Sequence, residues 1–210
     1  MVKETKEFYD TILENALEAC QKEGYDASFM PGLADARIAG KVSWGQWYST
    51  PSIRATGKTK QGNAVVVYAH IPNYFSNPQN IRAAKGQGLI NGAGILPEDE
   101  FQRLLDAEDK KTVFVVDYNA LKDSESGLIS VSKAIKHPQT VPFLGGKDRA
   151  EKYLHDFKEK YGRSQIGIWH CDDLGSKPVG CLLFLGSGSC NNDLISDSNL
   201  DVSGCFFGVR

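Results

Sequence analysis

Two histidines stand at the ends of apolar segments, where their side chains could take part in acid–base chemistry. His70 closes the segment VVVYAH and His170 closes the segment IGIWH. Asp117 lies near the end of a third apolar segment, VFVVDY, and Asp172 follows closely after His170. Imidazole changes its charge near neutral pH, so it can exchange a proton with a neighbouring carboxylate, and the same groups can ligate a metal. We therefore predict His70, Asp117, His170 and Asp172 as the catalytic residues.

The direction of the two histidine-bearing strands decides whether this site can form. Side chains alternate between the faces of a strand, so each histidine continues an apolar row and leaves it at the mouth of the sheet. If the two strands run parallel, His70 and His170 emerge at the same edge, whereas antiparallel strands place them at opposite edges. The alternative for each histidine is a structural side chain that is hydrogen bonded in the core. For Asp172 the alternative is a turn before Gly175.

The segments that must position these residues are predicted from the spacing of apolar side chains. Helical spacing predicts helices over residues 3–23, 96–109 and 146–162. Apolar or alternating runs that are bounded by turn residues predict strands over residues 41–50, 52–59, 63–71, 111–118, 165–170, 180–187 and 203–210. Pro51 separates the first two of these strands, and the Gln-Gly-Asn sequence at residues 61–63 indicates a hairpin turn.

Strands and helices that mix without regular alternation favour an α+β fold. We predict a single mixed, mostly antiparallel sheet of about six to seven strands with three main helices packed on it, in a single globular domain over residues 1–210. Helical crossovers separate residues 63–71, 112–118 and 165–170, so we expect a parallel pair among these strands.

The N-terminal helix is expected to be part of the core. Its apolar stripe contains Phe8, Ile12, Leu13 and Leu17. If Ile12 and Leu17 are fully buried, replacing either by alanine should cost about 2–5 kcal/mol of stability.

Composition and charge exclude several classes of protein. The chain has 210 residues, of which 41% are hydrophobic, and 24 basic against 26 acidic residues give a net charge of −2. This is the composition of an ordinary globular protein, and the charge disfavours a strongly basic nucleic-acid binder. No apolar run approaches the roughly 18 residues that a membrane-spanning helix needs, so we expect no membrane partner.

The N-terminus and the cysteines indicate a reducing compartment. The first residues, MVKETKEFYD, are charged and lack the apolar core of a secretory signal. The five cysteines are odd in number and include no C-x-x-C pair. We therefore predict a cytoplasmic protein in which at least four of the five thiols are free.

A second hypothesis rests on the aromatic and basic residues around residues 41–60. This segment carries Trp44 and Trp47 together with Arg54 and several lysines. Aromatic faces and cations on strands can hold a single-stranded nucleic acid by stacking and phosphate contacts, and an exposed flat face can hold a protein partner. The alternative for the same residues is a solvated strand face with its aromatic side chains in the core.

The predicted function is enzymatic: a cytoplasmic hydrolase or group transferase that acts on a small polar substrate through the His/Asp site. The alternative function is a non-enzymatic binding module that uses the strands around residues 41–60. GKTKQGN lacks the glycine spacing of a P-loop, and GLINGAG lacks the strand and helix of a dinucleotide fingerprint. The sequence therefore specifies no cofactor, and it leaves the metal, the substrate and the oligomeric state open.

Overall fold

Strands and helices are mixed along the whole described chain. The computed structural model describes residues 4–171, 173–187, 193–197 and 200–210. The strands are β1 (Thr5–Asp10), β2 (Asp26–Ala27), β3 (Tyr48–Lys58), β4 (Ala64–Ala69), β5 (Gly94–Ile95), β6 (Val113–Asp117), β7 (Gly127–Ser130), β8 (Gln165–Trp169), β9 (Val179–Leu185), β10 (Leu194–Ile195) and β11 (Gly204–Val209). The helices are α1 (Leu13–Lys22), α2 (Met30–Ile38), α3 (Pro78–Gln87), α4 (Glu98–Asp106), α5 (Tyr118–Lys122), α6 (Val131–Ala134), α7 (Thr140–Leu144) and α8 (Lys147–Tyr161), with a 3₁₀ turn at Tyr74–Ser76.

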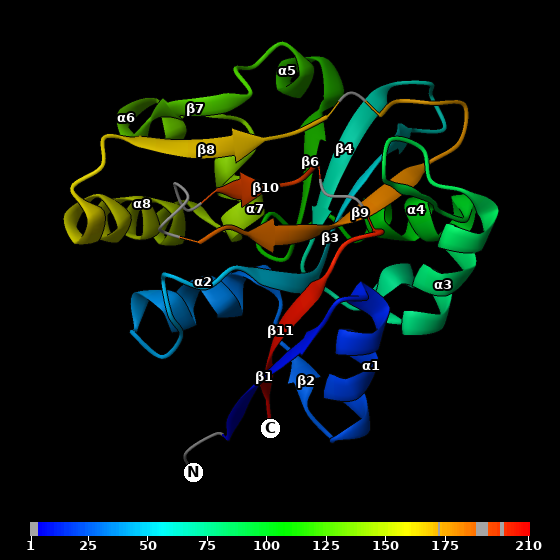
Figure 1. Ribbon diagram of the computed structural model, residues 1–210. Coiled ribbons are helices and arrows are strands. Elements are labelled where there is room, and N and C mark those ends of the chain that lie inside the picture. Colours follow the sequence, from blue (N-terminus) through cyan, green and yellow to red (C-terminus); the bar gives the residue numbers. More distant parts are fainter. Residues whose placement is uncertain (1–3, 172, 188–192, 198–199) are drawn as a thin grey trace.

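One sheet contains all 11 of these strands (Figure 1). Its main path runs β1-β11-β3-β9-β10-β8-β7, and β4 lies off this path, where it pairs with both β3 and β6. Most pairs are antiparallel, whereas β11 with β3 and β10 with β8 are parallel. The α+β class and the mixed sheet are thus confirmed. The predicted numbers of strands and helices are too low. The two-residue strands and the one-turn helices α5, α6 and α7 are too short to show a period in the sequence, whereas α2 and α3 are longer helices that the prediction did not count among the main ones.

The parallel pair that was expected among residues 63–71, 112–118 and 165–170 does not form. β4 and β6 are antiparallel, and β8 pairs with β7 and β10 instead. The chain returns to the sheet at the end of β4 that it left, where the His70 N–H donates to the carbonyl oxygen of Thr112 at 2.8 Å. A long connection that contains helices permits either strand direction, so its length alone did not determine the pairing.

The N-terminal segment is a strand followed by a helix, not one helix over residues 3–23. β1 pairs antiparallel with β11, and α1 begins only at Leu13. In β1, Phe8 is 4% exposed and the next residue, Tyr9, is 64% exposed, which is the alternation of a strand. Pairing with a strand from the other end of the chain therefore overrides the local helical spacing.

Two apolar residues of this segment are expected to differ sharply in their contribution to stability. Leu17 on α1 is 1% exposed and packs in the core, whereas Ile12 precedes the helix and is 41% exposed, so its predicted burial is wrong. We expect Leu17→Ala to lower the free energy of unfolding by about 2–5 kcal/mol and Ile12→Ala to lower it by less than about 1 kcal/mol. Urea denaturation measures both values, and equal losses would contradict the different burial of the two side chains.

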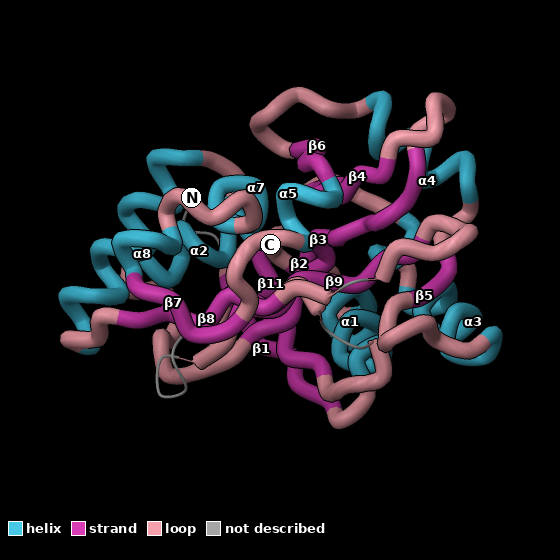
Figure 2. Tube along the Cα trace, turned by 90° about the horizontal axis from the view of Figure 1, so that it is seen from above, coloured by secondary structure: helices cyan, strands magenta, loops and turns pink. Residues whose placement is uncertain are grey.

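Helices cover the sheet on two sides, each with its own apolar core. Figure 2 shows α2, α7 and α8 on one flank of the strands and α1, α3 and α4 on the other. Alternation along β4 supplies both cores, because Val66 and Tyr68 belong to the first and Val65 and Val67 to the second. The apolar run of β4 is continuous because both of its faces are covered.

β3 is one strand that passes through Pro51, where the sequence predicts a break. Residues 41–47 are turns and not a strand, and β3 spans 11 residues. Its pairing with β9 shifts register between Ser49 and Ile53, and Pro51, which has no N–H to donate, lies in this irregular stretch. The irregularity lets β3 pair with β11, β9 and β4 at different points of its length.

The structure also bears on the predictions of free thiols and of no membrane partner. Four thiols are free in the structure, those of Cys20, Cys171, Cys181 and Cys205, and Cys190 lies outside the described residues. Within the described ranges, no helix is both long enough and apolar enough to cross a membrane. The organisation as a single domain stays a prediction.

Candidate binding surface

A buried ion pair fastens the segment after β8 to the middle of the sheet. Arg54 on β3 is fully buried, and its Nη1 donates to Asp173 Oδ2 at 2.6 Å. Its Nη2 donates to the carbonyl oxygen of Cys171 at 3.0 Å. Burial, the largest single effect, disfavours the charged form of Arg54, but the Asp173 carboxylate together with Tyr68, Cys181 and Cys171 outweighs burial and holds the pKa of Arg54 above its usual value. Cys171 and Asp173 are thereby held at fixed positions beside β3.

Gln139, which directly precedes α7, joins β8, β9 and β10. Its buried Nε2 donates to the carbonyl oxygen of Leu194 at 2.9 Å and to that of Trp169 at 3.3 Å. Its Oε1 accepts a hydrogen bond from Ser196 Oγ at 3.0 Å, and the carbonyl oxygen of Ser196 accepts one from Cys181 Sγ at 3.2 Å. One side chain thus satisfies buried polar groups of several segments, which makes the positions of these segments interdependent.

His137 and His170 lie side by side next to this network, with ring centroids 5.7 Å apart. His137 Nδ1 accepts the Gln139 N–H at 3.1 Å, so Nε2 carries the proton and donates it to the carbonyl oxygen of Glu125 at 3.1 Å. His170 Nε2 lies 3.2 Å from Ser124 Oγ. Burial and then the neighbouring His170 lower the pKa of His137 to about 4, and burial also lowers the pKa of His170. Both imidazoles are therefore neutral at pH 7.

These contacts hold a set of exposed and partly buried loop residues that we call the loop surface: the described residues 123–126, 170, 171 and 174–177. Its two parts are joined where Ser126 Oγ accepts the His170 N–H at 3.4 Å. In Figure 1 the chain leaves β8 and runs towards β4 before it turns back into β9. Its exposed members are Asp123, Glu125, Ser126, Gly175, Ser176 and Lys177. Loops on a rigid scaffold are where proteins commonly place binding residues.

His70 has a structural environment of its own, apart from His170. It is 6% exposed, and its Nε2 donates to the carbonyl oxygen of Pro142 at 2.8 Å. Ser52 Oγ accepts the Met30 N–H at 2.8 Å and donates its own proton to His70 Nδ1, 2.9 Å away. Burial lowers the pKa of His70 to about 4. This chain of hydrogen bonds connects β3 and the end of β4 with the first residue of α2 and with α7.

The structure does not bring Asp117 to His70. The antiparallel register places Asp117 opposite Val65. The step of five positions from Val65 to His70 corresponds to roughly 16 Å at the rise of a strand. The Asp117 carboxylate caps α5 by accepting the Ala120 N–H at 2.9 Å. Asp172 lies outside the described residues. The catalytic role of the four residues stays a prediction that these contacts do not support.

The flat aromatic and basic face predicted around residues 41–60, all of which are described, does not form. Trp44 is 6% exposed and stacks on Tyr153 of α8, with ring centroids 4.9 Å apart. Trp47 is partly buried and makes an edge contact with Tyr9. Arg54 faces the core, where it pairs with Asp173. Basic residues in a strand can pair inside a protein or lie in solvent, and the sequence pattern does not distinguish these two cases.

A group of side chains on α8 could hold a metal ion by proximity alone. Within the described part of the chain, His155, Asp156 and Glu159 bring one ligand atom each within 4.8 Å of the others. His155 is 66% exposed, and its contacts of 3.6 Å with Asp156 and 3.5 Å with Glu159 are ordinary for a solvated helix face. We therefore assign these residues to the surface of α8.

The residues that fasten the loop surface were missed in the sequence. The predicted site contains Asp172 but none of Asp173, Gln139 and Ser196. The one available signal for Gln139 is that it stands at the start of an apolar segment, residues 140–144. An amide side chain in such a place must find buried hydrogen-bond partners.

Comparison with solved structures finds a relative that is similar to this chain over its whole length. That structure is described as "Accommodation of massive sequence variation in Nanoarchaeota by the C-type lectin fold". The two chains share 54% sequence identity with a TM-score of 0.92, and the match covers 100% of this chain and 99% of the other. No protein-family model and no curated protein matches the chain.

This likeness overturns the predicted hydrolase or group transferase. It points to a binding module, because the matching protein has a C-type lectin fold over the same length. The small polar substrate has no support either. The binding-module alternative is thus the better of the two hypotheses, although Trp44 and Arg54 of the face that it proposed are buried.

Proposed function

Because the chain belongs to the family of C-type lectin fold proteins, we propose that it is a binding module that recognises a protein or carbohydrate partner and performs no chemistry on it. The observation that carries this proposal is the full-length likeness to a protein in which this fold accommodates massive sequence variation. Variation suits recognition, because residues at a contact surface can change while the framework stays constant.

The loop surface is the part of this chain that fits such a role. The buried side chains of Arg54, Asp173 and Gln139 hold its backbone and the adjoining strand ends in place by hydrogen bonds and an ion pair. The side chains of Glu125 and Lys177, in contrast, are exposed. Substitution of exposed side chains away from packed contacts usually changes stability by less than about 0.5 kcal/mol. The surface can therefore vary without loss of the fold.

The chemistry of the loop surface favours a polar partner. Its exposed side chains include two carboxylates, two hydroxyl groups of which one is on Ser126, and the ammonium group of Lys177. Polar side chains of both charges and hydroxyl groups suit the hydrogen-bonding surface of a protein or a carbohydrate.

A displayed library tests the proposal. Glu125, Ser126, Ser176 and Lys177 are randomised together, and the library is selected against immobilised hen lysozyme and, separately, against a glycan array. We expect folded binders from this library at a frequency about 100-fold above the background of the parent chain, because a preorganised framework lowers the entropic cost of binding.

A second library tests whether any four exposed positions would give binders equally well. It randomises Glu151, His155, Lys158 and Glu159, which are exposed on α8. Binders that come equally often from both libraries, or loop variants that fail to fold, would refute the assignment of recognition to the loop surface.

A further inference from the structure

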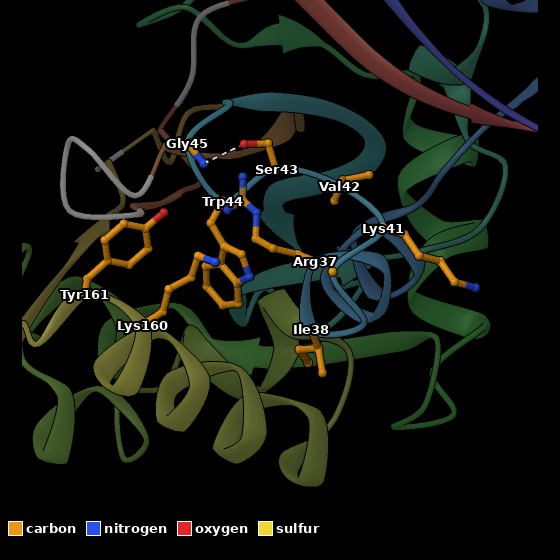
Figure 3. A pocket seen from close by; sticks show the side chains of 10 residues that line it. Arg37, Ile38, Lys41, Val42, Ser43, Trp44, Gly45, Lys160 and Tyr161 are labelled. Carbon is orange, nitrogen blue, oxygen red and sulfur yellow. Dashed lines mark hydrogen bonds between the residues drawn. The ribbon is translucent and has the colours of Figure 1, made fainter.

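We propose that the hollow between the C-terminal ends of α2 and α8 binds a small organic anion, a phosphate, sulfate or carboxylate group carried on a planar body. The hollow has a volume of about 450 Å³ and is lined by the end of α2, residues 40–45 and the last turn of α8 (Figure 3). Ligand pockets typically measure about 300–1,000 Å³, so one ring with an anionic group fits. The site shares no residue with the loop surface.

The floor of the hollow is rigid. Trp44 is 6% exposed and stacks on Tyr153 of α8, with ring centroids 4.9 Å apart. The guanidinium of Arg37 lies over the Trp44 ring, with Cζ 5.5 Å from the ring centroid. Its Nη1 donates to Tyr153 Oη at 2.8 Å and to the carbonyl oxygen of Gly186 at 3.0 Å. A ligand would meet a surface that is already ordered, which lowers the entropic cost of binding.

At the rim of the hollow, α8 provides one aromatic ring and one ammonium group. Figure 3 shows Lys160 and Tyr161 facing the hollow beside Trp44, whereas the side chain of Lys41 extends outward from its turn. Tyr161 is half-buried, and its ring centroid lies 6.4 Å from that of Trp44. The Tyr161 ring offers a face for a planar body, and the Lys160 ammonium offers a partner for its anionic group.

The opposite rim is a turn with a fixed hydroxyl group. The Gly45 N–H donates to Ser43 Oγ at 3.0 Å, so the hydroxyl proton of Ser43 is directed elsewhere and is available to an acceptor. Ser43 is exposed and lines the hollow. An oxyanion is the acceptor that gains most from such a donor next to a cation.

The charges that line the hollow have one sign. Arg37, Lys41 and Lys160 are cationic, and the described residues that line it include no carboxylate. The whole chain has a net charge of −2, so this concentration of positive charge is local. A concave site with charges of one sign focuses its field and raises the local concentration of opposite charges.

Stabilisation of helix ends explains these cations only in part. Lys160 lies in the last turn of α8, where a cation complements the helix dipole. Two carbonyl groups at the end of α2 already have partners, because Gly40 N–H donates to the carbonyl oxygen of Arg37 at 3.1 Å and Lys41 N–H to that of Ala36 at 2.8 Å. Capping of α2 therefore does not account for Lys41, and it does not account for the concave shape of the site.

Titration of the full chain with phenyl phosphate, monitored by amide chemical shifts and calorimetry, tests the site. We expect chemical shift changes in residues 37–45 and 160–161. We also expect a Kd at least about five-fold lower than that of inorganic phosphate or phenol, each of which offers half of the contacts. The affinity should fall as salt is added, because the cations are near the surface. Benzoate and phenyl sulfate distinguish the three anionic groups.

Paired variants separate the site from general surface charge. Lys160→Gln should weaken phenyl phosphate binding about five-fold, whereas Lys158→Gln, which removes an exposed charge from the same helix outside the hollow, should change it less than about two-fold. Equal effects of the two variants, chemical shift changes confined to residues outside 37–45 and 160–161, or phenol binding as tightly as phenyl phosphate would overturn the proposal. If inorganic phosphate binds as tightly as phenyl phosphate, the hollow does not recognise the planar body of the ligand.

Discussion

Asp173→Asn is expected to lower the free energy of unfolding by about 3–5 kcal/mol, because Arg54 would keep its charge in the core without a carboxylate beside it. The side chains of Arg54 and Asp173 are 0% and 1% exposed, so the guanidinium cannot turn towards solvent. The carbonyl oxygen of Cys171 remains as an acceptor, but a neutral oxygen does not replace a negative charge. The same loss would release the segment after β8 and so weaken the loop surface.

Urea denaturation of two variants measures this effect against a matched exposed pair. Asp35→Asn removes the carboxylate that binds Arg149 at 2.8 Å, where the two side chains are 58% and 26% exposed, and should cost less than about 1 kcal/mol. The double variant Arg54→Met with Asp173→Leu should recover most of the stability, because apolar side chains can replace a buried pair. A cost for Asp173→Asn no greater than that for Asp35→Asn would show that the buried charge is compensated in another way.

Segments whose own pattern agrees with their tertiary environment could be predicted from the sequence. The helix predicted over residues 146–162 is α8, with Tyr153, Leu154 and Phe157 buried as its stripe indicates. The strand predicted over residues 63–71 is β4, whose apolar run is covered on both faces. In these elements the spacing of the apolar side chains, the length of the segment and the flanking turn residues all favour the same structure.

Elements that depend on distant partners could not be predicted. β1 has the helical spacing that suggested a helix over residues 3–23, and only its pairing with β11 makes Phe8 a buried strand residue. β10 has two residues, and it exists because β8 and β9 lie on either side of it. A pattern within one segment contains no information on such partners.

The candidate surface was hidden from sequence reasoning for the same reason. Arg54 and Asp173 are far apart in the chain, and each taken alone resembles a solvated side chain. His70 and His170 were singled out for standing at strand ends, but hydrogen-bond partners determine their roles. Those partners, such as Ser52 and Pro142 for His70, come from segments that no spacing rule connects.

The folded protein is expected to lose stability as the pH falls from about 7 to about 5, because His70 must stay neutral to keep its contacts. Its Nδ1 accepts the proton of Ser52 Oγ, so a proton on Nδ1 would break that bond. Burial lowers the pKa of His70 from an ordinary 6.5 to about 4. Between these two values the unfolded chain binds the proton and the folded chain does not. Stability is therefore fully present above the unfolded pKa and is lost as the pH falls towards the folded pKa.

The size of this loss follows from the difference between the two pKa values. For His70 alone, a shift from 6.5 to about 4 corresponds to about 2 kcal/mol between pH 7 and pH 5. His137 acts in the same direction, because burial lowers its pKa to about 4 and its Nδ1 also accepts a hydrogen bond. Asp197 acts in the opposite direction, because burial raises its pKa. A variant at His70 is therefore needed to isolate the contribution of that residue.

Urea denaturation at several pH values, on the parent chain and on His70→Asn, provides that isolation. The asparagine Oδ1 can still accept the Ser52 proton and does not titrate, so this variant should lose about 2 kcal/mol less than the parent between pH 7 and pH 5, although it is less stable at pH 7. His155→Asn is the matched control, because it removes a histidine that is exposed on α8 and leaves the contacts of His70 in place. If His70→Asn follows the same pH dependence as the parent, the buried imidazole is not the group whose protonation destabilises the fold.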